Sequence, residues 1–402
     1  MAKLPIRQDI IPAGDAPILT VDTHTTGEPT RIIYSGFPAL HGHTLLQKKA
    51  DAKANHDHIR RRLMLEPRGH REMFGALLVN NTELTASGDA DIGVLFMHNE
   101  GFSDMCGHAT IALGRFLVDF DAEACPGLFP GRNLQLNKKT MTTTVNLHCP
   151  CGVVKVTVPV VVGLEGKLQS DPGKSVSFVS VDSYATGLDV DVTLPDASRW
   201  SELGERTRIT VDFCYGGAFY CVVDAEELGF DSLKSTDLDA LRRAAGSLMD
   251  ALNADPQYRQ FFQHPTEPDL GCLLGVIIRD TSRGVIPDGV DGAELGLCIF
   301  GDQQQVDRSP CGSGSAARRT IGHTKYNWPM EKKQVYHSLV SEASGRGGFT
   351  AYVVERSQDQ GDASDVAGER VRVRVEGQAF YTGFSTFVVE SADRISGSGF
   401  ML

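Results

Sequence analysis

Two stretches of the sequence, SDMCGHATIALGRF (103–116) and DRSPCGSGSAARRT (307–320), each place a cysteine directly before a glycine at the start of a run of small residues. The cysteines are Cys106 and Cys311, and an alanine lies six positions beyond each of them. Each stretch predicts a helix that begins at its cysteine, because residues that favour helices follow without a break. The match between the two stretches is short, and it is a hint of an internal repeat.

The rest of the chain is rich in strands. Apolar runs with many β-branched residues, such as GVVKVTVPVVV and RVRVRVEG, recur along its whole length. Helical periodicity is clearest in four segments, 57–65, 106–120, 236–253 and 311–325. Few helices among many strands favour an α+β or mixed α/β fold, in which each lobe wraps a curved sheet around a central helix. A chain of 402 residues is long for one core, so we expect two lobes.

Composition excludes several classes of protein. The formal net charge is −12 and the basic clusters are short, which disfavours nucleic acid as a partner. No apolar run is long enough to cross a bilayer and no leader peptide is recognisable, so we expect a cytoplasmic protein that binds no membrane. Nine cysteines are an odd number spread over a long chain, and they indicate reduced thiols rather than a disulfide framework.

A cysteine at a helix start has a chemical use. The unpaired N–H groups and the helix dipole stabilise a thiolate there, so we expect a lowered thiol pKa at Cys106 and Cys311. The same N–H groups can hold a carboxylate, and we expect Gly107, Gly312 and Gly314 to let a ligand approach the backbone. The competing interpretation is an inert buried cysteine that closes a turn. The presence of two such pairs favours a site.

Further motifs carry a family resemblance. MCGHATIALGRF and DRSPCGSGSAAR, together with VDTHTTGEPTRI (21–32), LEPRGHREMFGALLV (65–79) and YGGAFY (215–220), resemble the proline racemase family nearly end to end. The resemblance implies a diaminopimelate-epimerase-like fold with two pseudo-symmetric lobes and an active site in the cleft between them. It implies a first lobe at 1–183, completed by 380–402, and a second at 184–379. It also implies a homodimer and an enzyme that needs no cofactor.

The chemistry of inversion explains a pair of thiols. One group must remove the α-proton from one face and another must return a proton to the opposite face, so one cysteine acts as thiolate and the other as thiol. We therefore expect a proline racemase, with 4-hydroxyproline 2-epimerase and then trans-3-hydroxy-L-proline dehydratase as alternatives. The resemblance implies threonine at position 311 in animal and fungal dehydratases, whereas this chain has Cys311. A thiol-based redox protein and an amino-acid-binding protein remain alternatives from other classes.

The expected binding residues surround these cysteines. Backbone N–H groups of Gly107, His108, Gly312 and Ser313 are expected to hold the substrate carboxylate. The resemblance implies that Asp307 and the His108 side chain contact the substrate nitrogen, and that Phe74 and Phe300 form aromatic walls.

Other cysteines and histidines give weaker signals. HCPCG (148–152) lacks the paired spacing of structural zinc, so no metal is expected. Four cysteines in or beside apolar strand runs are interpreted as packing residues: Cys214, Cys221, Cys272 and Cys298.

Overall fold

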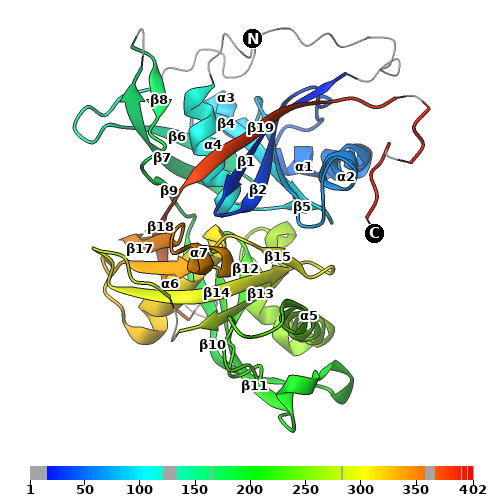
Figure 1. Ribbon diagram of the computed structural model, residues 1–402, viewed down its shortest axis with the longest axis vertical. Coiled ribbons are helices and arrows are strands. Elements are labelled where there is room, and N and C mark those ends of the chain that lie inside the picture. Colours follow the sequence, from blue (N-terminus) through cyan, green and yellow to red (C-terminus); the bar gives the residue numbers. More distant parts are fainter. Residues whose placement is uncertain are drawn as a thin grey trace.

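The computed structural model describes residues 16–120, 134–163, 166–281, 284–357, 367–390, 392–395 and 397–401. Figure 1 shows their helices and strands in two groups, one around α4 and the other around α6. The first group comprises the following elements: β1 (Ile18–Thr25), β2 (Glu28–Ser35), α1 (Leu45–Asn55), α2 (Asp57–Met64), β3 (Phe74–Val79), α3 (Glu83–Ser87), β4 (Ile92–His98), β5 (Phe102–Ser103), α4 (Gly107–Asp119), β6 (Thr142–Cys149), β7 (Gly152–Val162), β8 (Leu168–Ser170), β9 (Val176–Val179) and β19 (Ala379–Phe387).

The second group lies between β9 and β19 in the sequence. It comprises β10 (Ser183–Thr193), β11 (Arg208–Tyr215), β12 (Phe219–Asp224), α5 (Leu238–Ala254), β13 (Leu273–Asp280), β14 (Gly292–Phe300), β15 (Gln305–Asp307), α6 (Gly312–Tyr326), β16 (Gln334–His337), α7 (Leu339–Ser344), β17 (Phe349–Arg356) and β18 (Ala367–Gly377). Short 3-10 helices lie at Asp196–Ser198, Ser201–Leu203, Pro256–Phe262 and Pro268–Leu270. This content is the mixed α/β class that the sequence predicts.

The same succession of strand pairings occurs in both groups. In the first, β2 runs parallel to β3, β3 and β5 lie antiparallel to β4, and β6 returns parallel to β4. In the second, β12 runs parallel to β13, β13 and β15 lie antiparallel to β14, and β16 returns parallel to β14. A cysteine and a helix follow the short strand in each case. The hint of a repeat around the two cysteines therefore extends to the surrounding strands.

One connected sheet joins the two groups. Strands β10 to β14 continue through β16, β17 and β18 back to β10, which closes a ring of strands around α6. In the first group α4 packs against β1, β2, β7, β9 and β19. Strand β18 also pairs with β9, and β19 pairs with β1. The chain thus crosses between the groups before β10 and again before β19.

The hydrophobic core follows from this arrangement. The largest apolar cluster takes residues from α4, from α6 and from the inward faces of both groups of strands. Helix α4 is apolar around most of its circumference and is buried at eleven positions, which is the pattern of a helix enclosed by a sheet. Separate clusters lie outside the sheet, beneath α5 in the second group and beneath α1 and α2 in the first (Figure 1).

Four helices match their predicted segments to within a few residues, namely α2, α4, α5 and α6. Helix α1 was not expected from the sequence. Its segment LLQKKADAKAN has only three buried residues, so it lacks a continuous apolar stripe. A capping box at Thr44 and Gln47 supplies its start instead.

Candidate functional site

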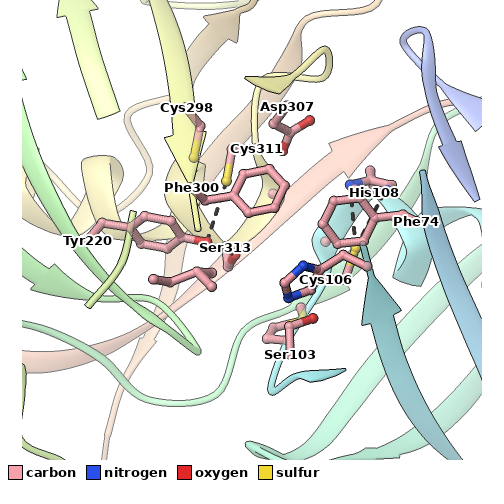
Figure 2. A pocket seen from close by; sticks show the side chains of 15 residues that line it. Phe74, Ser103, Cys106, His108, Tyr220, Cys298, Phe300, Asp307, Cys311 and Ser313 are labelled. Atoms are coloured by element: carbon pink, nitrogen blue, oxygen red, sulfur yellow. Dashed lines mark hydrogen bonds between the residues drawn. The ribbon is translucent and has the colours of Figure 1, made fainter. Parts of the chain in front are cut away.

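The two cysteines stand at the starts of the two enclosed helices. Cys106 is the residue before α4, and Cys311 is the residue before α6. Their side chains line one pocket with residues from both groups of elements (Figure 2). The pocket holds about 380 Å³ of space between the surrounding atoms, including its solvent-filled mouth. All nine site residues expected from the sequence line it: Phe74, Cys106, Gly107, His108, Phe300, Asp307, Cys311, Gly312 and Ser313.

The helix starts meet at two glycines. A methyl group added to Gly107 would lie 2.4 Å from Cα of Gly312, and one added to Gly312 would lie 2.6 Å from Cα of Gly107. Real Cβ atoms do not approach other atoms this closely, so only glycine fits at either position. From the sequence, the small size of these two glycines was expected to admit a ligand. In the structure, it allows the two helices to come into contact. That contact points the unpaired N–H groups of both helices toward one place.

The Cys311 thiol meets the expectation of a lowered pKa. Its pKa falls to about 6, first because the Cys298 side chain donates a hydrogen bond to the sulfur. Hydrogen bonds from the Tyr220 hydroxyl and the Gly314 backbone and the positive charge of Arg318 act in the same direction, while burial opposes them. Cys311 is therefore poised as a thiolate near neutral pH.

The same expectation is wrong for Cys106. Burial raises the pKa of this thiol well above its ordinary value, and the charges of Asp307, Glu28 and Cys311 raise it further. A hydrogen bond from the Ala109 backbone only partly opposes them. Because the helix start is dry and faces acidic groups, its dipole does not prevail. The pocket therefore holds one thiolate and one thiol.

Two ring-bearing side chains flank the Cys106 thiol. The sulfur lies 3.4 Å from both ring nitrogens of His108, whose main-chain carbonyl accepts a hydrogen bond from Thr25 at 2.9 Å. Burial lowers the pKa of His108 to about 3, although a hydrogen bond to the Pro29 backbone acts in the opposite direction. The imidazole is therefore neutral. The Phe74 ring meets the His108 ring edge to face at 4.8 Å and lies 5.3 Å from the Phe300 ring.

Asp307 lies on the Cys311 side of the pocket. Its carboxylate accepts a hydrogen bond from the Ser309 backbone at 2.8 Å, and the Ser309 hydroxyl accepts one from the Cys311 backbone at 3.2 Å. Burial, and then the charge of Cys311, raise the pKa of the Asp307 carboxyl well above its ordinary value. Close behind it, burial and the charge of Asp307 raise the pKa of the Glu28 carboxyl as well.

Ionic contacts join the two groups of elements beside the pocket. The Arg308 backbone donates to Glu28 at 2.6 Å, and its guanidinium lies 2.9 Å from Glu72. Arg242 of α5 pairs with the same Glu72. The Glu100 carboxylate accepts hydrogen bonds from the backbone of Asp302 and Gln303, both at 2.8 Å. These contacts tie the two groups of elements together next to Phe74 and Asp307 of the pocket.

Sequence reasoning missed several residues that line the pocket, among them His98, Ser103, Tyr220 and Cys298. Tyr220 ends the motif YGGAFY, and Ser103 stands at the head of the first cysteine stretch, so both had a signal. Cys298, interpreted from the sequence as a packing residue, instead faces Cys311 (Figure 2). Every residue from Glu294 to Phe300 in β14 is buried, so no alternation indicated which side chains point inward.

The described part of the chain offers no group of three or more His, Cys, Asp and Glu side chains that could hold a metal ion. His148 of the HCPCG stretch forms a hydrogen bond with Thr82 at 2.9 Å. None of the described helices is long and apolar enough to span a membrane.

Comparisons with known proteins show the family and the fold of the chain. The chain is 37% identical over 396 residues to a trans-L-3-hydroxyproline dehydratase of Xenopus tropicalis, which covers 98% of this chain and 97% of that protein. It is 29% identical over 376 residues to a proline racemase of Acetoanaerobium sticklandii, covering 94% and 96%. The crystal structure of a probable proline racemase from Agrobacterium radiobacter K84, with bound carbonate, superposes with a TM-score of 0.74 at 23% identity and 96% coverage of both chains. The profile of the family described as Proline racemase matches residues 20–401, and the chain belongs to that family.

Proposed function

We propose that this protein is a cofactor-independent proline racemase, in which one of Cys106 and Cys311 removes the α-proton of proline and the other returns a different proton to the opposite face. The observation that carries the proposal is the pair of thiols in one pocket, with the pKa of Cys311 lowered and that of Cys106 raised. Inversion by two bases needs this unequal pair, because one sulfur must accept a proton while the other supplies one. In the reverse direction the two cysteines exchange roles.

The neighbouring groups fit a zwitterionic ring substrate. The backbone N–H groups of Gly107, His108, Gly312 and Ser313 bind the carboxylate, which becomes an enediolate when the α-proton leaves. The Asp307 carboxylate pairs with the ring ammonium. Phe74 and Phe300 pack against the methylene groups of the ring, and neutral His108 borders the nitrogen.

The fold is proposed to work as two pseudo-symmetric lobes of the diaminopimelate-epimerase-like kind. The repeated order of strand pairings supports this assignment. We place the boundary at 183/184 and assign residues 380–402, of which 391, 396 and 402 lie outside the described residues, to the first lobe, because β19 pairs with β1. The substrate then sits in the cleft between the lobes, where each helix contributes one thiol.

Dehydration of trans-3-hydroxy-L-proline is a second candidate, favoured by the 37% identity to a protein with that name. A thiolate would remove the α-proton, the C3–O bond would break, and the hydroxide would leave as water with a proton from an acid. The enamine formed would then tautomerise to a cyclic imine. This elimination needs one base, whereas the chain retains two cysteines. Epimerisation of 4-hydroxyproline uses the same inversion on a ring that carries a hydroxyl.

The deciding experiment incubates the protein in D₂O, without added cofactor, with L-proline, trans-4-hydroxy-L-proline and trans-3-hydroxy-L-proline. Deuterium at the α-carbon together with D-proline, detected by chiral chromatography, is the expected result for racemisation. Cyclic imine from the 3-hydroxy substrate identifies dehydration instead. Absence both of α-exchange with all three substrates and of cyclic imine contradicts the proposal and leaves a redox or binding role.

Variants assign the two thiols. Cys106→Ser and Cys311→Ser are each expected to lose nearly all racemisation in both directions, because every turnover uses both sulfurs. Cys311→Thr is expected to keep or gain weak dehydration, since removal of the Cys311 charge lowers the pKa of Cys106. Cys221→Ser, on the far side of β12 in the cluster beneath α5, is the control. Near wild-type racemisation by Cys311→Thr contradicts the two-base mechanism.

A further inference from the structure

Cys311 has more hydrogen-bond donors to its sulfur than Cys106 has. Its sulfur is 3.5 Å from the hydroxyl oxygen of Tyr220 in β12, and that hydroxyl is 2.7 Å from the hydroxyl of Ser313 in the first turn of α6. Tyr220 has one hydroxyl proton to give. If it donates the proton to the Cys311 sulfur, its oxygen is free to accept from Ser313. The three side chains then form a directed chain of hydrogen bonds that ends on the sulfur (Figure 2).

Cys298 approaches the same sulfur from another strand. It lies in β14 directly opposite Asp307 of β15, and both side chains line the pocket beside Cys311. Its hydrogen bond to Cys311 raises the pKa of Cys298, together with burial, and lowers that of Cys311. Of the two sulfurs, Cys311 also receives donors from Tyr220 and the Gly314 backbone, so Cys298 remains the thiol and acts as the donor.

The backbone fixes the sulfur against these donors. The backbone of Cys311 has φ +61° and ψ 103°, a conformation that residues other than glycine rarely adopt. The backbone of Cys106 is extended, with φ −143°. A methyl group on Gly314 would lie 2.8 Å from the Cys311 sulfur, so glycine there leaves room for it. A strained residue at a functional position indicates that placement of its side chain matters.

The charged and titratable groups around Cys311 come from several elements. Arg318 of α6 favours the thiolate, while its guanidinium is also paired with Glu294 at 2.9 Å. Asp307 of β15 and Cys106 at the start of α4 face it as acidic groups. Burial, and then the charge of Cys311, raise the pKa of the Asp307 carboxyl well above its ordinary value. The hydrogen bonds from Cys298, Tyr220 and the Gly314 backbone each lower the pKa of Cys311 more than the charge of Arg318 does.

We propose that Tyr220 and Cys298 are positioning residues that hold Cys311 as the thiolate in the empty enzyme, and so decide which of the two cysteines is the base when substrate arrives. The role of Cys311 as the base depends on the proposed function. The ionisation of Cys311 in the absence of substrate does not depend on that function, and the test measures this ionisation.

The experiment measures alkylation of Cys311 and Cys106 by iodoacetamide as a function of pH, with each site quantified by peptide mapping in the intact protein. In the wild type, Cys311 is expected to react as a thiolate at neutral pH and Cys106 only at much higher pH. Tyr220→Phe and Cys298→Ala are each expected to slow alkylation of Cys311 at about pH 5, below its pKa, by about tenfold, which corresponds to a rise of one unit in pKa. Cys298→Ser, which keeps a donor, is expected to restore most of the rate.

Matched controls separate this role from packing. Cys221→Ala alters the neighbour of Tyr220 on β12, whose side chain enters the other core cluster, and it is expected to leave the Cys311 profile unchanged. If Tyr220→Phe does not fold, the comparison of Cys298→Ala with Cys298→Ser still tests whether a donor at position 298 stabilises the Cys311 thiolate. An unchanged profile in the folded variants, or equal rates for the Ala and Ser variants, overturns the proposal. A normal Cys311 profile in a protein without α-exchange overturns only the proposed function.

Discussion

The α-carbons of Gly107 and Gly312 touch at the point where α4 and α6 begin, so that neither position has room for a Cβ atom. This contact is the physical basis of the pocket. It brings two helix starts, each preceded by a cysteine, closer together than any pair of ordinary residues would allow. The spacing of the two thiols therefore depends on two residues that have no side chain.

Alanine at either glycine is expected to push the helix starts apart. We expect Gly107→Ala and Gly312→Ala each to destabilise the fold by about 1–3 kcal/mol, the usual effect of overpacking, and to abolish turnover. Thermal unfolding and the D₂O exchange assay measure the two effects. Gly101→Ala is the control, because a methyl group there meets no atom within 4 Å. Full activity in either variant would contradict the role given to the contact.

Asp307→Asn is expected to weaken substrate binding and to change Cys106 at the same time. The amide cannot pair with a ring ammonium, so KM for proline rises. Loss of the acidic group also removes one cause of the raised pKa of Cys106, so its alkylation begins at lower pH. Asp288→Asn, at an exposed position, is the control. An unchanged Cys106 profile would mean that Asp307 and Cys106 do not interact.

Substrate binding is expected to depend on pH through the same carboxyl. In the empty pocket, burial and then the charge of Cys311 raise the pKa of Asp307 well above its ordinary value, so the group keeps its proton to a higher pH than an exposed carboxyl does. A cationic ring nitrogen favours the ionised form, so binding displaces that proton. KM should therefore fall as the pH rises toward the pKa of the empty form. Initial-rate measurements across pH check this, and a KM that rises over that range contradicts it.

Glu100→Gln is expected to loosen the contact between the two groups of elements and so to hinder closure around a ligand. The carboxylate caps two backbone N–H groups of the turn that follows β14, and the neutral amide would bind them more weakly, by about 1 kcal/mol. We expect the affinity for the planar analogue pyrrole-2-carboxylate to fall about fivefold. Isothermal titration measures it, with Glu205→Gln at an exposed position as the control. Equal affinities would exclude a role for Glu100 in closure.

Activity is expected to survive metal removal. The proposed chemistry needs only two sulfurs, and the residues that the structure describes offer no cluster of three or more metal-binding side chains. Dialysis against a chelator should leave the exchange rate unchanged. Loss of activity that zinc restores would defeat this prediction.

The sequence predicted the site better than its surroundings. The positions of Cys106 and Cys311 could be predicted because a cysteine before a glycine at a helix start is a local sequence pattern. In the structure, each cysteine does directly precede a helix. The contact between Gly107 and Gly312 had no such signal, since it depends on how distant strands bring two helices together. The sequence predicted one thiolate and one thiol, but the assignment of the thiolate to Cys311 rather than Cys106 was missed. It arises from Cys298 and Tyr220 on one side and from acidic neighbours on the other, which lie far apart in the sequence.

The pairing of β19 with β1 also determines when the protein can finish folding. During synthesis β1 emerges before the other described strands and has β2 on one edge, while its other edge stays open until β19 has been made. An open strand edge is a place where a second unfinished chain can add a strand. Helix α4 also lacks the cover of β19 during that time. Each nascent chain therefore carries an aggregation-prone edge on the ribosome until its last long strand has docked.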